Sequence, residues 1–257
     1  MRSSHILRSS LALSAVALAP ALLHAQREYS APRSASASTA GITTIRVANG
    51  SGRLTITGNP SATAVRATGT AHASSQSELQ DVKLLVERDG NDIVVRPDMP
   101  DSWNGCDCSL DMTVEVPTSI QLEVRDGSGG AELRNVGRAR VQSGSGGVRI
   151  EHTSGDVSVR SGSGEAELSD VHGNVEASSG SGGVTMDGVT GSVEIEHAGS
   201  GSVSLSKVGG SVHVGSIGSG SLDADGVGGD LTVESKGSGS VHYTSVRGKV
   251  SVPTRRW

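Results

Sequence analysis

Two cysteines offer the most distinctive covalent chemistry in this chain. Cys106 and Cys108 flank a single aspartate and are the only cysteines in 257 residues. In an oxidising compartment we expect a disulfide between them, although closing so small a ring strains the bond and makes it easier to reduce. Free thiols, a bridge to another chain, and a redox or metal-binding role are the alternatives.

A second set of side chains is suited to binding a cation. Glu176, Glu194 and His213 follow one another at intervals of 18 and 19 residues, and carboxylate and imidazole groups are common metal ligands. Solvated polar residues on a β-sheet face are the simpler interpretation. We therefore predict no metal ligand and no cofactor.

The phrase Gly-Ser-Gly resembles several known sites when it is met once. No copy extends to the Gly-x-Ser-x-Gly of hydrolases, to Gly-x-Gly-x-x-Gly, or to a P-loop. No aspartate recurs after the phrase, as the calcium-binding haemolysin repeat requires. The sequence therefore predicts no catalytic residue.

The phrase is instead the corner of a repeat. Its steps are 17, 18, 18, 19, 19 and 19 residues, which is typical of a solenoid. At each corner we expect both glycines to adopt positive φ angles, where a Cβ atom would clash. The predicted corner glycines are Gly127, Gly129, Gly144, Gly146, Gly162, Gly164, Gly180, Gly182, Gly199, Gly201, Gly218, Gly220, Gly237 and Gly239.

Each repeat contains two short alternating segments, such as Val148–Ile150 and Val157–Val159, separated by a turn. Alternation directs the outer two residues of each segment inward and the middle one outward. The turn holds one apolar residue, usually valine, with Thr153 as the exception. The chain is therefore predicted to be all-β. We expect a right-handed β-helix or β-roll with two short strands per 18–19-residue rung and an N-terminal β cap.

The chain divides into four predicted segments. Residues 1–25 read as a signal peptide, because Arg2 and Arg8 precede an apolar run and Ala25 suits cleavage. Residues 26–41, rich in Ser, Ala and Pro, are predicted to be a flexible linker. Residues 42–126 form an N-terminal β region and cap, residues 127–257 form the solenoid repeats, and 42–257 make one continuous domain.

Three local signals shape the predicted cap. Residues 42–56 look like an early copy of the repeat. Asp89-Gly90-Asn91-Asp92 joins two apolar segments and indicates a hairpin, and residues 77–80 favour one short helical turn. We expect the cap to cover an otherwise unpaired strand edge.

Composition excludes several classes of function. The formal net charge is −5, and Lys and Arg are scattered, so no surface for nucleic acid or anionic lipid is indicated. Aromatic residues make up only 2% of the chain, too few for the girdles of an outer-membrane barrel. No membrane span is expected after signal cleavage.

The Val-x-Leu, Val-x-Gly, Val-x-Val rhythm between Gly-Ser-Gly corners resembles the bacterial Toastrack-type putative adhesin family, a domain of unknown function. Asn49–Gly58 and Val114–Pro117 are similar to the family's opening strand and turn and to its strand before the repeats. The resemblance covers residues 41–252. It implies an exported all-β solenoid with a role in adhesion or stress sensing at the cell envelope, and no catalytic residues.

We therefore predict an exported, periplasmic or cell-surface protein without enzymatic activity. Its expected partner is an envelope protein or a glycan, and not nucleic acid. The alternatives are a structural spacer and a carbohydrate-active enzyme on a β-helix, for which Glu194 would be a candidate acid.

Overall fold

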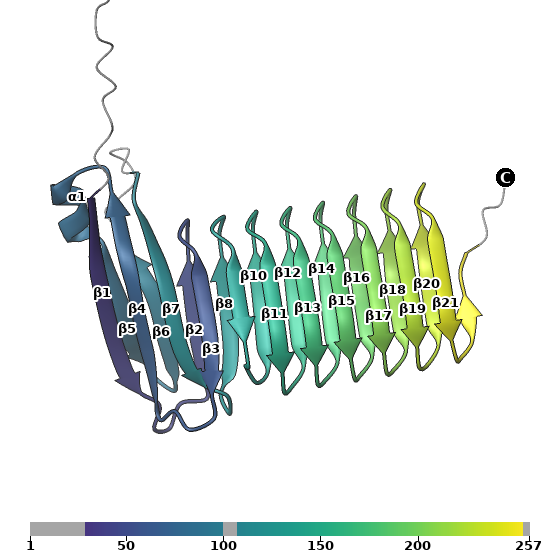
Figure 1. The fold of residues 1–257 in the computed structure, drawn as a ribbon, viewed down its shortest axis with the longest axis horizontal. Helices are drawn as coiled ribbons and strands as arrows, with labels where there is room; N and C mark the ends of the chain where they lie inside the picture. The colour runs from purple at the N-terminus through teal and green to yellow at the C-terminus, as the bar shows by residue number, and fades with distance from the viewer. Residues whose placement is uncertain (1–28, 100–106, 254–257) are drawn as a thin grey trace, which may run out of the picture.

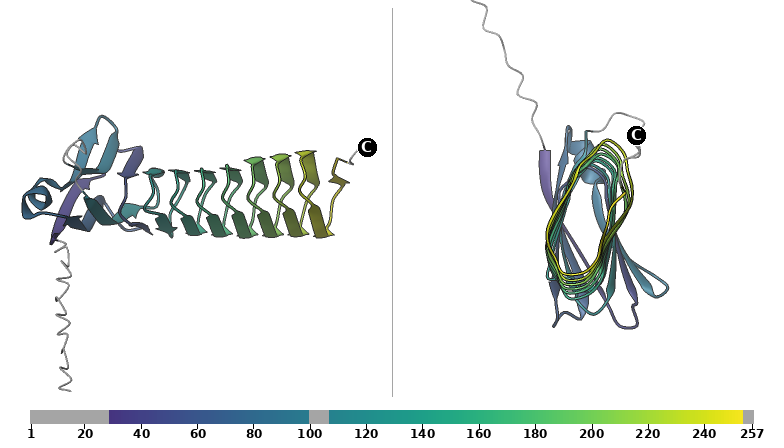
Figure 2. Two further views of the ribbon diagram at one scale, coloured as in Figure 1. Left: turned by 90° about the horizontal axis from the view of Figure 1, so that it is seen from above. Right: turned by 90° about the vertical axis from the view of Figure 1, so that its right-hand side faces the viewer.

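The computed structural model describes residues 29–99 and 107–253. Within these ranges it contains twenty-two strands and one short helix, and the strands form two sheets of eleven. Figure 1 shows a regular array of rungs extending from a wider N-terminal region, and the right-hand view of Figure 2 shows the rungs stacked as flattened loops. The predicted all-β solenoid with two strands per rung is confirmed.

In the array, each rung contributes one strand to each sheet, and neighbouring strands pair in parallel. The first sheet contains β9 (Ala131–Arg134), β11 (Val148–Thr153), β13 (Ala166–Val171), β15 (Val184–Val189), β17 (Val203–Val208), β19 (Leu222–Val227) and β21 (Val241–Val246). The second sheet contains β8 (Gln121–Asp126), β10 (Ala139–Ser143), β12 (Val157–Ser161), β14 (Val175–Ser179), β16 (Val193–Ala198), β18 (Val212–Ile217), β20 (Leu231–Lys236) and β22 (Val250–Ser251).

The core lies between the two sheets and is built from small aliphatic side chains. Val148 and Ile150 of β11 face Val157 and Val159 of β12, and all four are almost completely buried. The middle residue of each triplet points outward, as the alternation predicts. Thr153 occupies the buried position that valine fills in other rungs, and its hydroxyl group has no hydrogen-bond partner among the described residues.

The Gly-Ser-Gly phrases lie at one corner, but the predicted reason for their glycines is wrong. None of these fourteen glycines has a positive φ angle. They are required because successive rungs approach each other closely along the backbone. A Cβ atom on Gly182 would lie 2.0 Å from the carbonyl oxygen of Gly164 in the rung before. The close stacking is fixed by backbone hydrogen bonds such as the one from Ser181 N to Gly162 O, at 2.8 Å.

Positive φ angles occur at the opposite corner, one residue before the inward valine or threonine. This column is left-handed in every rung of the array, yet five of its seven members are not glycine. His152, for example, has a φ angle of 55°. The column consists of Asn135, His152, Asp170, Gly188, Lys207, Gly226 and Ser245.

The repeat lengthens from 18 to 19 residues through a bulge. The register between β14 and β16 shifts after Ala177, so that Ser179 pairs with Ala198. The shift changes the buried residue that precedes each Gly-Ser-Gly phrase. Ser143, Ser161 and Ser179 are buried, and the hydroxyl group of each donates a hydrogen bond to the backbone carbonyl oxygen three residues later in the chain. In the following rungs this position holds the buried Ala198 and Ile217.

The stack begins before residue 127 and does not follow the order of the chain. β2 (Thr44–Asn49) lies between β6 (Asp92–Asp98) and β8, and β3 (Leu54–Asn59) lies between β7 (Ser109–Pro117) and β9. Residues 44–59 therefore make a genuine rung, as their resemblance to the repeat predicts. The boundary predicted at 126/127 falls within a continuous stack, because β8 pairs in parallel with both β2 and β10.

The remaining N-terminal elements close this end of the stack. β4 (Ala64–Ala73) pairs antiparallel with β7, and β5 (Lys83–Asp89) forms the predicted hairpin with β6. The predicted helical turn is α1 (Gln76–Asp81), which begins with a reciprocal contact between Ser75 and Glu78. The hydrogen bond from the Ser75 hydroxyl group is the main cause that lowers the pKa of Glu78.

The flexible linker predicted for residues 26–41 is wrong for most of its length. β1 (Tyr29–Ser38) is a ten-residue strand that pairs antiparallel with β4 at the edge of the first sheet. Ala31, Ala35 and Ala37 pack against the core from one face of β1. The alternation of alanine with serine has a period of two, but these side chains are too small to produce a strong hydrophobic pattern.

The predicted signal peptide, residues 1–25, lies outside the described residues, as does Cys106. Cys108 is disulfide-bonded and packs against the core. No helix within residues 29–99 and 107–253 is long and apolar enough to cross a membrane.

Candidate functional site

The outer face of the first sheet is covered by side chains that pair with one another. Arg149 lies 2.5 Å from Glu167 and 3.5 Å from Glu151, and Arg134 contacts Glu151 at 3.3 Å. Further along the stack, the Lys207 ammonium group lies 3.0 Å from Asp187, and its hydrogen bond is the main cause that lowers the pKa of Asp187. The part of this face from β9 to β17 therefore carries ion pairs of its own.

The outer face of the second sheet carries a groove of about 590 Å³. It runs along the stack over five rungs, from β10 to β18, and one end reaches Gln121. Two columns of side chains form its banks, one at the corner where each strand begins and one at the middle residue of each strand. The corner bank contains Arg138, Asp156, Asn174, Ser192 and Ser211, and the strand bank contains Arg140, Ser158, Glu176, Glu194 and His213.

The corner bank is a structural ladder. Arg138 donates to the Asp156 carboxylate, and from Asp156 onward each side chain accepts a hydrogen bond from the backbone N–H of its counterpart one rung later. The Asp156 carboxylate accepts from Asn174 N at 3.0 Å, the Asn174 amide oxygen from Ser192 N at 2.9 Å, and the Ser192 hydroxyl from Ser211 N at 3.2 Å. The ladder continues through Asp230 to Lys249. Backbone N–H groups that strand pairing leaves without partners are satisfied in this way.

The strand bank supplies the groups that are free to meet a ligand. Among the described residues, the side chains of Arg140 and Glu194 form no hydrogen bond or ion pair, and both are exposed. They are three rungs apart, a separation of about 14 Å at a strand spacing of ~4.8 Å. The Ser158 hydroxyl lies between them on the same bank. The groove thus offers a cation, a hydroxyl and an anion in line.

The sequence placed Glu176, Glu194 and His213 in one column, and the structure does so too. Their side chains are nevertheless engaged differently. Glu176 accepts a hydrogen bond from Arg160 at 2.8 Å, and His213 lies 3.3 Å from Glu234. No group of three His, Cys, Asp or Glu side chains placed to hold a metal ion is found in the part of the chain that the structure describes.

Sequence reasoning missed both the groove and the ladder. The ladder has a readable signal, because Asp156, Asn174, Ser192, Ser211 and Asp230 all precede an inward aliphatic residue at the start of a second strand. Asx and Ser side chains at a fixed position favour hydrogen bonds to nearby backbone groups. The groove has no such signal, since its shape depends on how far the corner projects beyond the sheet.

No protein-family model and no curated protein matches the chain. Similar solved structures include a putative adhesin from Bacteroides fragilis, with 12% identity, a TM-score of 0.46, and coverage of 86% of this chain and 96% of that one. A putative adhesin from Parabacteroides merdae has 12% identity, a TM-score of 0.41, and the same two coverages of 86% and 96%. A putative lipid binding protein from Parabacteroides distasonis has 15% identity, a TM-score of 0.41, and coverages of 86% and 97%.

Proposed function

We propose that this protein is an exported binding module of the cell envelope, of adhesin type and without enzymatic activity, which holds its partner in the groove of the second sheet. The proposal depends on one observation: Arg140 and Glu194 are exposed and unpaired among the described residues, in a groove whose other bank is fixed by a ladder. Several charged groups on the first sheet are instead paired with their neighbours.

The chemistry of the groove favours an extended polar partner. Its lining includes no Phe, Tyr or Trp side chain, so affinity would come mainly from hydrogen bonds and charge pairs rather than from stacking. A partner that lies along the stack would meet a repeat of about 4.8 Å per rung. An envelope glycan or an extended segment of an envelope protein with an anionic group near Arg140 and a cationic group near Glu194 fits this arrangement.

The test compares two double variants that remove the same charges from opposite faces. Arg140→Gln with Glu194→Gln alters the groove, whereas Arg149→Gln with Glu167→Gln alters the first sheet. Each variant is immobilised and exposed to envelope extract, soluble glycans and peptidoglycan, and captured material is identified by mass spectrometry. We expect the groove variant to lose the captured partner and the control to keep it, with circular dichroism unchanged in both.

Two outcomes would contradict the proposal. The first is a folded wild-type protein that captures nothing from any of these sources. The second is equal capture by both variants. If removing one complete rung outside the groove leaves the biological role intact in the absence of any binding, a structural spacer is the better description. Turnover of a glycan that Glu194→Gln abolishes would instead indicate an enzyme.

A further inference from the structure

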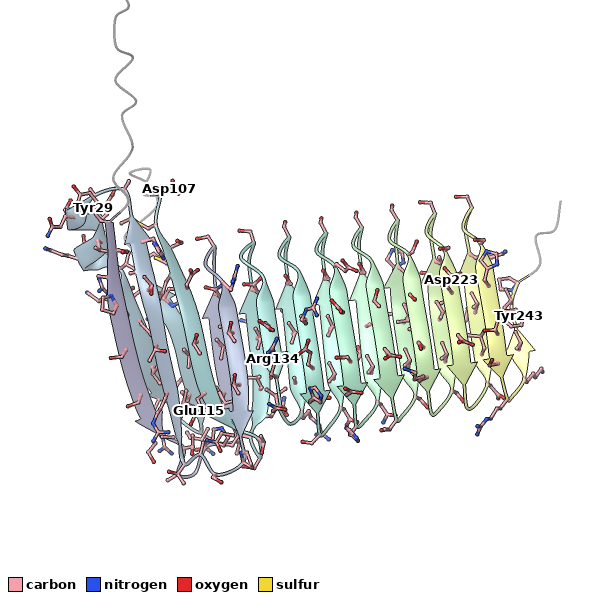
Figure 3. The ribbon with its side chains drawn as sticks, in the orientation of Figure 1. Tyr29, Asp107, Glu115, Arg134, Asp223 and Tyr243 are labelled. Atoms are coloured by element: carbon pink, nitrogen blue, oxygen red, sulfur yellow. The ribbon has the colours of Figure 1, made fainter. Side chains whose placement is uncertain are left out.

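The last rung of the array differs from all earlier rungs in its exposure. Tyr243 of β21 has 48% of its surface exposed, whereas Ala224 at the same position in β19 has 3%. Val241 and Val246 are also partly exposed, although their counterparts in β19 are fully buried. No strand among residues 29–99 and 107–253 covers the interior of the first sheet at this end, and Tyr243 lies at the end of the molecule opposite Tyr29 (Figure 3).

The edge strands at the two ends of the stack differ in their content of proline and charged residues. At the N-terminal end, β1 contains Pro32, which has no N–H to donate, and β5 carries exposed charges at Lys83, Glu87 and Arg88. Proline and charged residues are the usual devices that prevent edge strands from pairing with other chains. The C-terminal edge strand β21 reads Val-His-Tyr-Thr-Ser-Val and has neither.

The backbone of β21 presents regular hydrogen-bonding groups at this edge. In a parallel sheet, the N–H and C=O groups of one residue point to the same neighbouring strand, and those of the next residue point to the other. Leu222 N donates to Ser240 O at 2.9 Å, so residues 240 and 242 face β19. The N–H and C=O groups of Val241 and Tyr243 therefore point away from the stack, and no described strand pairs with them.

We propose that β21 pairs with β21 of a second copy of this chain, so that two solenoids join end to end across a two-fold axis at Tyr243. A two-fold axis perpendicular to the sheet makes the two strands antiparallel. Tyr243 then becomes a hydrogen-bonded pair with its own copy, in which each residue donates its N–H to the other's carbonyl oxygen. The two tyrosine rings meet on the inner face, and the row of inward apolar residues continues into the partner.

A second copy fits this edge better than an unrelated strand because the edge complements itself. His242 falls opposite Thr244 of the partner subunit on the outer face, and no like charges are brought together at neutral pH. The contact also continues the first sheet through backbone hydrogen bonds, with antiparallel pairing at the junction where the rungs of each copy pair in parallel. The end of one rung is small, so we expect a weak dimer at the lower limit of specific interfaces.

Sedimentation equilibrium of the purified protein from micromolar to millimolar concentration tests the proposal. We expect the wild type to dimerise reversibly and Tyr243→Lys to raise the dissociation constant roughly tenfold or more, because two lysines then face each other at the axis. Ser204→Lys, on the outer face of the fully paired strand β17, adds the same charge and should leave the dissociation constant unchanged.

Cysteine cross-linking tests the register independently. The two-fold axis places the paired Cα atoms of residue 243 about 5.5 Å apart, within reach of a disulfide. Tyr243→Cys should cross-link to its own copy on mild oxidation, and Ser204→Cys should not. A wild type that stays monomeric, or a dimer that neither Tyr243 variant affects, would overturn the proposal. So would a protein that dimerises only after residues 254–257 are removed, because those residues would then be the occupant of this edge.

Discussion

Adjacent glycines at one corner should respond in opposite ways to the same substitution. In Gly182→Ala the new Cβ atom would lie 2.0 Å from the carbonyl oxygen and 2.6 Å from the carbonyl carbon of Gly164. Relief of this contact requires the rungs to separate by about 1 Å or more, which weakens two backbone hydrogen bonds, Ser181 N to Gly162 O and Gly180 N to Ser161 O. At about 1 kcal/mol for each bond and ~1–3 kcal/mol for overpacking, we expect a loss of about 3–5 kcal/mol in the free energy of unfolding.

Gly183→Ala is the matched control. A Cβ atom on Gly183 would lie 3.5 Å from its nearest atom, the carbonyl oxygen of Ser202, and the φ angle of Gly183 is not positive. Alanine therefore fits, and it reduces the entropy of the unfolded chain. We expect this variant to be as stable as the wild type or more stable by ~0.4–1 kcal/mol.

Urea denaturation followed by circular dichroism measures both effects as shifts in the transition midpoint. The order expected is Gly183→Ala at or above the wild type, and Gly182→Ala far below it. Close stacking of backbones would not be the reason for the corner glycines if Gly182→Ala lost less than about 1 kcal/mol, or if both variants lost stability equally.

Three further substitutions address single features of the array. Thr153→Val removes a buried hydroxyl that has no partner among the described residues, so the midpoint should rise by the equivalent of about 1–2 kcal/mol; a fall would show that the hydroxyl is satisfied. His152→Gly relieves a left-handed φ angle of 55° and should be more stable than His152→Ala by about 1 kcal/mol in the same denaturation assay; equal stabilities would contradict this. Lys207→Met removes the hydrogen bond that chiefly lowers the pKa of Asp187 from its ordinary value of 3.8. A carboxyl group with a lowered pKa contributes stability above its unfolded pKa and loses it as the pH falls through the folded one, so the variant should be less stable than the wild type at pH 7 and equal to it in strong acid. Carboxyl-detected NMR should also show the pKa of Asp187 rising in the variant.

The fold was predictable because its sequence pattern is both local and repeated. Each inward pair, such as Val157 and Val159, lies on one face of a strand, and the constant step brings equivalent residues into register. The hairpin between β5 and β6 was predictable from Gly90, whose φ angle of 62° suits a tight turn. These features depend on a few neighbouring residues, which a sequence displays directly.

The features that sequence reasoning missed depend on contacts between distant or adjacent backbones. β1 buries small alanines against β4, so its alternation carries little hydrophobic contrast. The corner glycines were identified correctly as corners, but the distance between stacked backbones is a property of the assembled array. Arg140 and Arg149 look alike in the sequence, and only the folded structure shows that Arg149 is paired while Arg140 is free among the described residues.

The out-of-order rung has a consequence for how the chain reaches its folded state. β2 pairs with β8, and the paired residues are 77 positions apart in the sequence, as Asn49 and Asp126 are. β2 therefore has no partner on this side until β8 is available. Every later rung needs only the preceding 17 to 19 residues. Closing the long loop should therefore be the slow nucleating event, after which rungs add quickly from the N-terminal side in the direction of synthesis. Elongation from such a seed would leave a shortened chain folded as far as it extends, whereas loss of β2 would remove the template on which the whole array grows.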